Sequence, residues 1–243
     1  MGPRYSIIIP TKNEEEGIAK VICSIPREIR KYSEIIVPDS SDDLTPIIAK
    51  GLGAKVLKVK RGKGRAMKMA VERSRGDILI FLDADGTDPP QYIPKLLKKL
   101  ENNNLVLGCR SGKPFKEDDR VMRDLFKIYC RMISPIFMLV GFNVHDPSAG
   151  FRAIRKKDWN RLNLKSNGLD IEAEMNIKAV REGFKVKEVL IPHLRRAGGL
   201  MKSKVIFHPK NWIRMLKPLL VYVKDEKARR KIRKHISELL KKI

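Results

Sequence analysis

The sequence predicts an α/β protein with a mostly parallel central sheet. Through the first half of the chain, short stretches rich in isoleucine, valine and leucine alternate with helical patterns, as they do in βαβ units. Clusters of polar residues follow directly after several of these apolar stretches. The carboxyl ends of parallel strands lie along one edge of a sheet, and ligands bind outside that edge. We therefore expect the functional site there.

The strands are predicted from short apolar runs bounded by polar or turn-forming residues. The first run, YSIIIP, is stopped by a proline, and the fourth, DILIFL, is the most apolar and leads directly into Asp83-Ala84-Asp85. The predicted strands are Tyr5–Pro10, Glu34–Val37, Ala54–Val59, Asp77–Leu82, Asn104–Gly108, Arg152–Arg155 and Lys185–Ile191.

Helices are predicted wherever apolar residues recur at helical spacing between these strands. One of them follows the basic loop at residues 60–65 and ends at Arg73, and a short one follows the strand that begins at Arg152. The other predicted helices are Glu15–Ile25, Thr45–Leu52, Arg120–Val140 with an interruption at Pro135, and Asp170–Glu182. From Asn211 the pattern is that of a basic amphipathic helix.

The formal net charge of +24, from 52 Lys and Arg against 28 Asp and Glu, favours a partner rich in phosphate. Nucleic acid, an anionic membrane surface and a small phosphorylated substrate all qualify. The chain has no helix-turn-helix, no RNA-binding motif and no basic patch interleaved with aromatic residues. We therefore expect no nucleic-acid partner.

The cysteines at 23, 109 and 130 are odd in number and lack metal-finger spacing, as is typical of reduced thiols in a cytoplasmic protein. No secretory signal is visible, and the longest apolar run, near Met132 to Val144, is shorter than the ~20 residues that span a bilayer. Gln91 is the only glutamine among abundant Lys and Glu, a bias typical of thermophile proteins.

Asp83-Ala84-Asp85 is the sharpest chemical signal. Two carboxylates two residues apart on a turn can converge on one divalent cation. Mg²⁺ and Mn²⁺ prefer such hard oxygen ligands and share their coordination shell with substrate phosphates. A cation bound there stabilises the charge on a departing nucleoside diphosphate as a Lewis acid. The alternative for this pattern alone is a solvated turn after a strand.

Four segments occur in the order SIIIPTKNEEEGI, IIVPDSSDDLT, GKGRAM and ILIFLDADGTDPP. Their order and spacing resemble family 2 glycosyltransferases of the GT-A fold, and within that group the dolichyl-phosphate (polyprenyl-phosphate) mannose and glucose synthases. The likeness covers Tyr5 to Lys204 and continues through DPSAGFRAI and GLDIEAEMNIKAVREGFKVKEVLIP. It implies a GT-A catalytic domain over residues 1–208, with a mostly parallel sheet flanked by helices. A basic amphipathic helical tail over residues 209–243 follows.

The resemblance implies that residues of these segments border the donor nucleotide. They are Pro10, Thr11, Asn13, Glu14, Asp39, Gly62, Lys63, Gly64, Arg65, Asp83, Ala84 and Asp85. Asp83 would contact the ribose and the metal, and Asp85 would ligate the metal directly. Thr87 stands where the family often has a further ligand, with Asp88 beside it. Pro38 replaces an aspartate that is common in the family, so guanine and uracil both stay open as the base. An ordinary basic turn is the alternative for the loop at residues 62–65.

The second half of the chain resembles an acceptor-phosphate pocket in the lipid-phosphate synthases. Its expected members are Arg110, Arg120, Arg123, Arg131, Ser148 and Arg152, with Arg123 and Arg152 expected to orient the acceptor. Guanidinium groups suit phosphate because they bind it through paired, planar hydrogen bonds. The alternative is that the arginines of the helix beginning at Arg120 only solvate its face. Further phosphate contacts are expected from Arg195, Arg196, Lys202 and Lys204.

A phosphate acceptor is largely dianionic at neutral pH and needs no general base, whereas a hydroxyl acceptor needs one. Asp170, Glu172 and Glu174 are the carboxylates available for that role, although a helix cap or structural ion pairs would also explain them.

The resemblance implies inverting, metal-dependent transfer of a hexose from a GDP-sugar or UDP-sugar to polyprenyl or dolichyl phosphate, with mannose favoured and glucose next. The alternative within the family is a soluble phosphorylated or hydroxyl acceptor, and a distant alternative is a nucleic-acid-binding protein. The tail pairs apolar residues with many cations, which favours peripheral attachment to the cytoplasmic face of a membrane. Packing of the tail on the catalytic domain, or a dimer contact, is the other interpretation.

Overall fold

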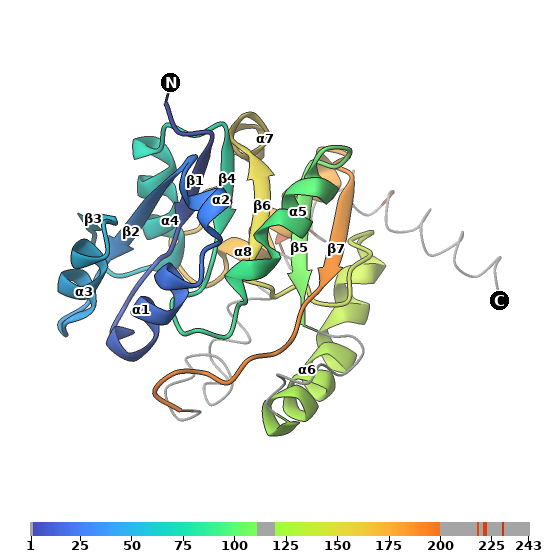
Figure 1. Ribbon diagram of the computed structural model, residues 1–243. Helices are drawn as coiled ribbons and strands as arrows, with labels where there is room; N and C mark the ends of the chain where they lie inside the picture. Colours follow the sequence, from blue (N-terminus) through green and yellow to red (C-terminus); the bar gives the residue numbers. More distant parts are fainter. Residues whose placement is uncertain (1, 111–119, 200–217, 219–220, 223–229, 231–243) are drawn as a thin grey trace.

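A computed structural model describes residues 2–110 and 120–199, together with residues 218, 221, 222 and 230. Seven strands form one sheet in the order β3-β2-β1-β4-β6-β5-β7 (Figure 1). Strands β1 to β4 run parallel, and β5 runs parallel to β7. Strand β6 is antiparallel to both of its neighbours, β4 and β5. The prediction of a mostly parallel α/β sheet is confirmed.

The described elements alternate strand and helix through the first half of the chain. The strands are β1 Tyr5–Ile8, β2 Ser33–Asp39, β3 Lys55–Lys58, β4 Ile78–Phe81, β5 Leu105–Cys109, β6 Arg152–Arg155 and β7 Val186–Leu190. The helices are α1 Glu15–Cys23, α2 Arg27–Arg30, α3 Thr45–Gly51, α4 Lys63–Arg73, α5 Ile93–Leu100, α6 Arg120–Leu139, α7 Lys156–Leu162 and α8 Ile171–Arg181. A single 3-10 turn, Pro90–Tyr92, leads into α5.

Helices cover both faces of the sheet, and each face has its own apolar core. One core joins the buried residues of α4, α6, α7 and α8 to those side chains of the strands that point to that face. The other joins α1, α2, α3 and α5 to the alternate side chains of the same strands. In β1, for example, Ile8 belongs to the first core, while Ile7 belongs to the second. This alternation follows from the two-residue side-chain period of a strand.

All seven predicted strands are present, and their ends differ from the prediction by one or two residues. The prediction that Pro135 interrupts the helix beginning at Arg120 is wrong, because α6 continues through Pro135. Pro135 lies on the exposed side of α6, whereas Ile133 and Phe137 on either side of it pack into the core. This packing offsets the hydrogen bond that a proline removes from a helix. The tail predicted over residues 209–243 lies almost wholly outside the described residues.

The carboxyl ends of β1, β2 and β4 meet along the lower edge of the sheet in Figure 1. The segment after β7 runs along this edge toward α1, and α6 projects beyond the same edge (Figure 1). Pairing extends past β1, because Thr11 forms an isolated parallel bridge with Asp39. The loops expected to carry the chemistry therefore emerge side by side.

The loop before α8 is tied to the start of α4. The backbone N–H groups of Gly64 and Arg65 donate to the carbonyl oxygens of Gly168 and Asn167, at 3.0 and 3.2 Å. Glu174 in turn holds this loop by accepting hydrogen bonds from the backbone N–H groups of Lys165 and Ser166 at 2.7–3.0 Å. The buried carboxylate of Glu174 thus holds the loop before α8, and that loop holds the basic loop at the start of α4.

We predict that Glu174→Gln lowers the free energy of unfolding by about 1–3 kcal/mol at pH 7, because a neutral amide accepts these hydrogen bonds less strongly. Burial alone would raise the pKa of Glu174, but hydrogen bonds from Lys178 and the loop amides outweigh it and lower the pKa below 4.5. The unfolded state therefore binds this proton more readily than the folded state does.

The contribution of Glu174 is accordingly complete above pH 4.5 and is lost as the pH falls through its lower folded pKa. Urea unfolding of both proteins at pH 7 and at about pH 3 measures the difference. Glu182→Gln is the matched control, because Glu182 forms only a half-exposed pair with Arg161. A Glu174→Gln deficit that stayed the same at both pH values would contradict the assignment.

Candidate functional site

The loops after β1 and β2 are joined through the carboxylate of Asp39. Its Oδ1 accepts hydrogen bonds from Thr11 Oγ1 at 2.7 Å and Ser41 Oγ at 2.6 Å, and its Oδ2 accepts one from the backbone N–H of Ser41 at 3.1 Å. Asn13 adopts a left-handed φ of 55°, and its side-chain oxygen accepts a hydrogen bond from the backbone of Asp42 at 3.0 Å. Two of the residues expected to border the nucleotide, Thr11 and Asp39, thus form one hydrogen-bonded unit.

Asp85 is buried and has partners on both carboxylate oxygens. Its Oδ1 accepts hydrogen bonds from the backbone N–H of Thr87 at 3.0 Å and from the Thr87 hydroxyl at 2.6 Å. Its Oδ2 contacts Nη1 of Arg196, whose Nη2 lies 2.9 Å from each carboxylate oxygen of Glu14. Arg196 therefore bridges the loop after β1 and the loop after β4. Thr87, expected as a metal ligand, orients the Asp85 carboxylate.

Asp83 is paired with Lys63, the first residue of α4. Lys63 Nζ lies 2.6 Å from Oδ1 of Asp83 and 2.5 Å from Oε1 of Glu172 on α8. Burial disfavours the ammonium, but the two carboxylates outweigh it and raise the pKa of Lys63 above its ordinary value. Burial likewise acts against the charge of Asp83, yet Lys63 lowers the pKa of that carboxyl. Asp83 and Lys63 are therefore both charged at neutral pH.

Asp88 is buried beneath the Asp83-Ala84-Asp85 turn and accepts a hydrogen bond from the backbone N–H of Asp83 at 3.0 Å. Burial, followed by repulsion from Asp83, raises the pKa of Asp88 to about 8. The carboxyl of Asp88 thus lies against the backbone of this turn.

Glycine is required where backbones approach the site closely. A Cβ atom on Gly150 would collide with the carboxylate of Asp83, and one on Gly17 would collide with the carbonyl oxygen of Ala84. Gly62 and Gly64 lie equally close to the carbonyl oxygens of Asn167 and Ser166. The glycines of the basic loop therefore have a packing role.

Arg110 follows β5 and is held by the loop that contains Asp146. Its guanidinium forms a two-pronged contact with the Asp146 carboxylate, at 2.8 and 3.2 Å, and its Nη2 donates to Ser148 Oγ at 3.2 Å. The ring of Phe126 lies 4.3 Å from the guanidinium carbon. Burial opposes the charge of Arg110, but Asp146 outweighs burial and raises the pKa of the guanidinium. Arg110 is thus a fixed cation on the acceptor side.

Arg152 lies under the site and not in it. Its side chain is fully buried and donates to the carbonyl oxygens of Ala149 and Pro147 at 2.6 and 2.9 Å, and to Asn176 Oδ1 at 2.6 Å. Burial lowers the pKa of Arg152 to about 10, so the group stays charged at neutral pH. Through these hydrogen bonds Arg152 holds the loop that carries Ser148. A fully buried side chain in this position does not suit the expectation that Arg152 orients the acceptor directly.

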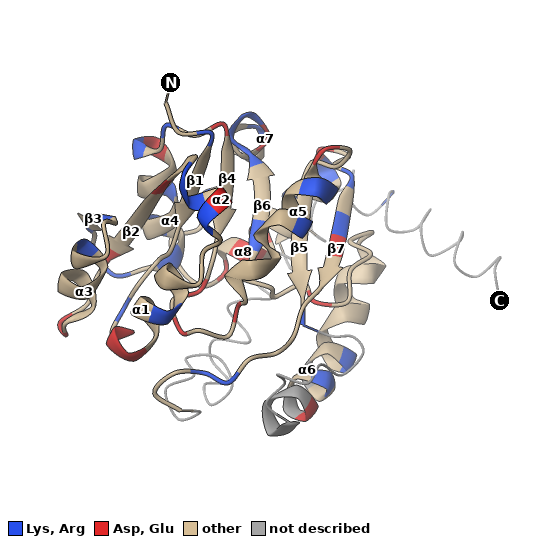
Figure 2. Cartoon of the chain, in the orientation of Figure 1, with Lys and Arg blue, Asp and Glu red and all other residues tan. Residues whose placement is uncertain are grey.

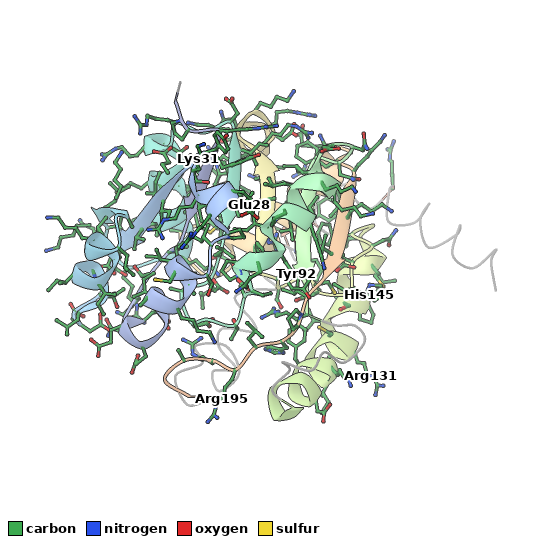
Figure 3. All side chains as sticks on the ribbon, in the orientation of Figure 1. Glu28, Lys31, Tyr92, Arg131, His145 and Arg195 are labelled. Carbon is green, nitrogen blue, oxygen red and sulfur yellow. The ribbon has the colours of Figure 1, made fainter. Side chains whose placement is uncertain are left out.

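The other expected arginines are dispersed. Arg131 and Arg195 are exposed and point outward from α6 and from the segment after β7 (Figure 3). The side chains of Arg120 and Arg123, and the whole of Lys202 and Lys204, lie outside the described residues. Basic positions occur on every described α-helix but only on β3, β6 and β7 among the strands, without gathering on one element (Figure 2). Within the residues that the structure describes, the basic side chains are therefore dispersed.

The donor set at the turn fits a hard divalent cation, because Asp83 and Asp85 offer carboxylate oxygens next to further acidic groups. Among the residues that the structure describes, no group of three or more His, Cys, Asp and Glu side chains could hold a metal ion. A cation on these two carboxylates would therefore take its other ligands from elsewhere, and substrate phosphates are the usual source for Mg²⁺ or Mn²⁺.

Sequence reasoning did not assign Asp146 or Lys63's partner Glu172 to the site. Asp146 begins the DPSAGFR segment, so the sequence alone predicts that it lies near Ser148. Its pairing with Arg110 depends on the adjacency of β5 and β6, which the sequence does not show. Glu172 was considered only as a general base. Its salt bridge to Lys63 joins positions far apart in the chain and has no local signal in the sequence.

Comparison with known proteins places this chain in a family. The sequence profile described as Glycosyl transferase family 2 matches residues 6–162. A dolichyl-phosphate hexose transferase of Haloferax volcanii is 32% identical over 195 residues, which are 79% of this chain and 84% of the relative. A dolichol-phosphate mannosyltransferase of Pyrococcus furiosus is 31% identical over 222 residues, 84% of this chain and 61% of the relative. An undecaprenyl-phosphate mannosyltransferase of Micrococcus luteus is 28% identical over 224 residues, 84% of this chain and 91% of the relative.

Solved structures share the fold. Glucosyl-3-phosphoglycerate synthase of Mycobacterium tuberculosis, in complex with Mn²⁺, UDP-glucose and phosphoglyceric acid, has a TM-score of 0.68 at 23% identity, covering 89% of this chain and 80% of that one. Mannosyl-3-phosphoglycerate synthase of Rubrobacter xylanophilus has a TM-score of 0.66 at 18% identity, covering 93% of this chain and 75% of that one. With its profile match across all of β1 to α7, the chain belongs to glycosyl transferase family 2 and is a glycosyltransferase of the GT-A fold.

Proposed function

We propose that this glycosyltransferase moves a hexose from a nucleoside-diphosphate sugar to the phosphate of a polyprenyl (dolichyl) phosphate, with inversion at the anomeric carbon. The names of the Haloferax, Pyrococcus and Micrococcus relatives support this acceptor class. We favour mannose as the hexose, with glucose next, and GDP or UDP as the carrier.

The observation on which the proposal depends most is the contact between Arg110 and Ser148. The side chain of Arg110 is 14% exposed, its Nη2 lies 3.2 Å from the Ser148 hydroxyl, and its charge also lowers the pKa of Asp83. An arginine and a hydroxyl group beside the donor-side aspartate are the groups that recognise a phosphate monoester. We assign them to the acceptor phosphate, with Arg123 of α6 as a further contact.

In the proposed step, an oxygen of the acceptor phosphate forms a bond to the anomeric carbon while the bond from that carbon to the β-phosphate oxygen breaks. The electron pair of the broken bond leaves with the nucleoside diphosphate. Arg110 and Ser148 orient the attacking phosphate, and Asp39 and Asp83 position the nucleotide. The acceptor is already largely dianionic, since its second pKa is about 6, and no proton has to be removed from it.

The carboxylates of α8 support this choice over a hydroxyl acceptor. Glu172 is paired with Lys63 at 2.5 Å, and Glu174 is held by Lys178 at 2.8 Å and by backbone amides. A general base must be placed to take a proton from the substrate. The structural partners of both carboxylates support a phosphate acceptor, which needs no base.

A divalent cation, Mg²⁺ or Mn²⁺, would be held by Asp83 and Asp85 and would stabilise charge on the departing diphosphate as a Lewis acid. Thr87 and Asp88 keep the turn that presents these carboxylates in place. Mn²⁺ in the structure of the Mycobacterium synthase supports this assignment.

We propose peripheral attachment at the cytoplasmic face of a membrane, where such an acceptor is available. Helix α6 supports it, because α6 is apolar on two opposite sides. Ile128, Met132 and Leu139 are 58%, 59% and 47% exposed, and with Pro135 they fall within roughly 60° of arc at about 100° per residue. The inward side consists of Phe126, Cys130, Ile133 and Phe137. No described helix is long and apolar enough to cross a bilayer.

The proposed acceptor can be tested by incubating the protein with Mn²⁺, a polyprenyl phosphate and a panel of labelled GDP-sugars and UDP-sugars. We expect label to become extractable into organic solvent with one or a few donors. A parallel reaction with 3-phosphoglycerate in place of the lipid tests the soluble-acceptor alternative. Label transferred only to that compound would refute the lipid proposal.

Asp85→Asn should reduce turnover roughly 100-fold or more, because the cation that would stabilise the charge on the leaving group loses a carboxylate ligand. Asp77→Asn is the control, since Asp77 is exposed and lies at the opposite end of β4. Initial rates with saturating Mn²⁺ measure the effect, and thermal unfolding checks that the fold is intact. An Asp85→Asn protein with a near-normal rate would remove the metal role from the proposal.

The outer side of α6 can be tested with Ile128→Asp and Met132→Asp combined. Burying a side chain of this size in an apolar environment is worth about 1.5–3 kcal/mol, so the double variant should lose at least about tenfold in partition onto anionic vesicles. Ile47→Asp on α3, where Ile47 is 68% exposed, is the matched control. Co-sedimentation with phosphatidylglycerol vesicles measures the partition. Unchanged binding by the double variant would show that α6 does not face the lipid.

A further inference from the structure

The segment that follows β7 inserts one arginine between the two acidic loops of the site. Arg196 donates from Nη2 to both carboxylate oxygens of Glu14, at 2.9 Å each, and contacts Oδ2 of Asp85 with its other terminal nitrogen. The backbone N–H of Ala197 donates to the carbonyl oxygen of Asp85 at 2.9 Å. The Arg196 side chain is only 10% exposed. Arg196 is therefore built into the site and is not a surface charge.

The position of Arg196 conflicts with a cation on Asp85. Oδ1 of Asp85 already accepts two hydrogen bonds from Thr87, and Oδ2 is the oxygen that Arg196 contacts. Mg²⁺ binds carboxylate oxygens at about 2.0–2.1 Å, so a divalent ion on Oδ2 would lie within a few ångströms of the guanidinium. Like charges at that distance in a buried site repel strongly. The ion and the guanidinium compete for the same carboxylate.

We infer that Arg196 is a resident counter-ion of Asp85, which the guanidinium leaves when a divalent cation binds. This inference rests on the proposed function, in which Asp85 binds that cation. Lys63 stands in the same relation to Asp83, but it also keeps Glu172 as a second partner. Arg196 differs because its segment, which runs along the edge of the sheet after β7, contains no described helix or strand (Figure 1).

The released guanidinium has an acceptor available when the donor is bound. The Nε of Arg196 is buried and has no hydrogen-bond partner within the described part of the chain, so its present contacts leave one donor unused. A diphosphate held next to the cation presents several anionic oxygens, which a guanidinium binds through paired hydrogen bonds. Arg196 would thus exchange Asp85 for the donor diphosphate while Glu14 stays within its reach.

This exchange makes the binding of cation and nucleotide interdependent. Without nucleotide, the cation has to displace Arg196 from Asp85, and the displaced guanidinium gains no new partner. The cation should therefore bind weakly. With a nucleoside diphosphate present, the displaced guanidinium gains phosphate contacts, so the cation should bind more tightly. By linkage, the cation raises the affinity for the nucleotide by the same factor.

The test is Mn²⁺ binding to the full chain, followed by electron paramagnetic resonance or calorimetry, without nucleotide and with GDP or UDP. For Arg196→Gln we expect the affinity for Mn²⁺ alone to rise about tenfold, within the usual range of coupling between sites. The enhancement of Mn²⁺ binding by the nucleotide should shrink, because the variant has no guanidinium to transfer.

Arg195→Gln is the matched control, since it removes the same charge from the neighbouring position, where the side chain points into solvent (Figure 3). Its affinity for Mn²⁺ should change less than about twofold, as expected for a screened surface charge. If Arg196→Gln does not fold, Arg196→Lys keeps the charge but loses the two separate nitrogens with which the guanidinium bridges Glu14 and Asp85. It should shift Mn²⁺ affinity in the same direction by a smaller factor.

Unchanged or weaker binding of Mn²⁺ by both Arg196 variants would overturn the inference, because Arg196 would then support the site and not compete for it. A wild-type chain that binds no Mn²⁺ even with GDP and UDP would overturn the proposed metal role itself, and the inference with it. The two failures are distinguishable, since the first leaves nucleotide-dependent Mn²⁺ binding intact.

Discussion

The site depends on the pairing of buried carboxylates with buried cations at one edge of the sheet. Glu14, Asp83, Asp85, Asp146 and Glu172 are each held by Lys63, Arg110 or Arg196. An unpaired charge in such a position is costly to bury, whereas a paired and hydrogen-bonded one is tolerated. The loops after β1, β4, β5 and β7 take up their positions because these pairs connect them. The ion pairs that neutralise the carboxylates are therefore the same contacts that assemble the site.

The same pairing suits the highly charged substrate of the proposed function. A nucleoside-diphosphate sugar would bring negative charge to an edge rich in carboxylates, so cations would have to accompany it or be supplied by the protein. In that proposal Lys63 and Arg196 are such cations for the donor, and Arg110 is one for the acceptor. Each is held by carboxylates, so the arginine and lysine side chains are already oriented.

The two sides of the proposed site are organised by different parts of the fold. The proposed donor side is built on β1, β2 and β4, where parallel strands bring Thr11, Asp39 and Asp83 to one edge. The proposed acceptor side is built on the β5–β6 pair, with Arg110 directly after β5 and Ser148 shortly before β6. Arg152 and Asn176 hold the loop before β6 through hydrogen bonds to the carbonyl oxygen of Pro147.

The sequence by itself determined the alternation of strands and helices, and with it the edge at which the site lies, because apolar periodicity and strand-end polar clusters are local properties of the chain. It also predicted Asp83 and Asp85 from their position after the most apolar strand. Only the tertiary structure decided what these carboxylates contact. The antiparallel direction of β6, the burial of Arg152 beneath the site, and the contacts of Arg196 with Glu14 and Asp85 all join segments that are far apart in the chain. Such contacts depend on how the layers pack, and no local pattern of residues encodes them.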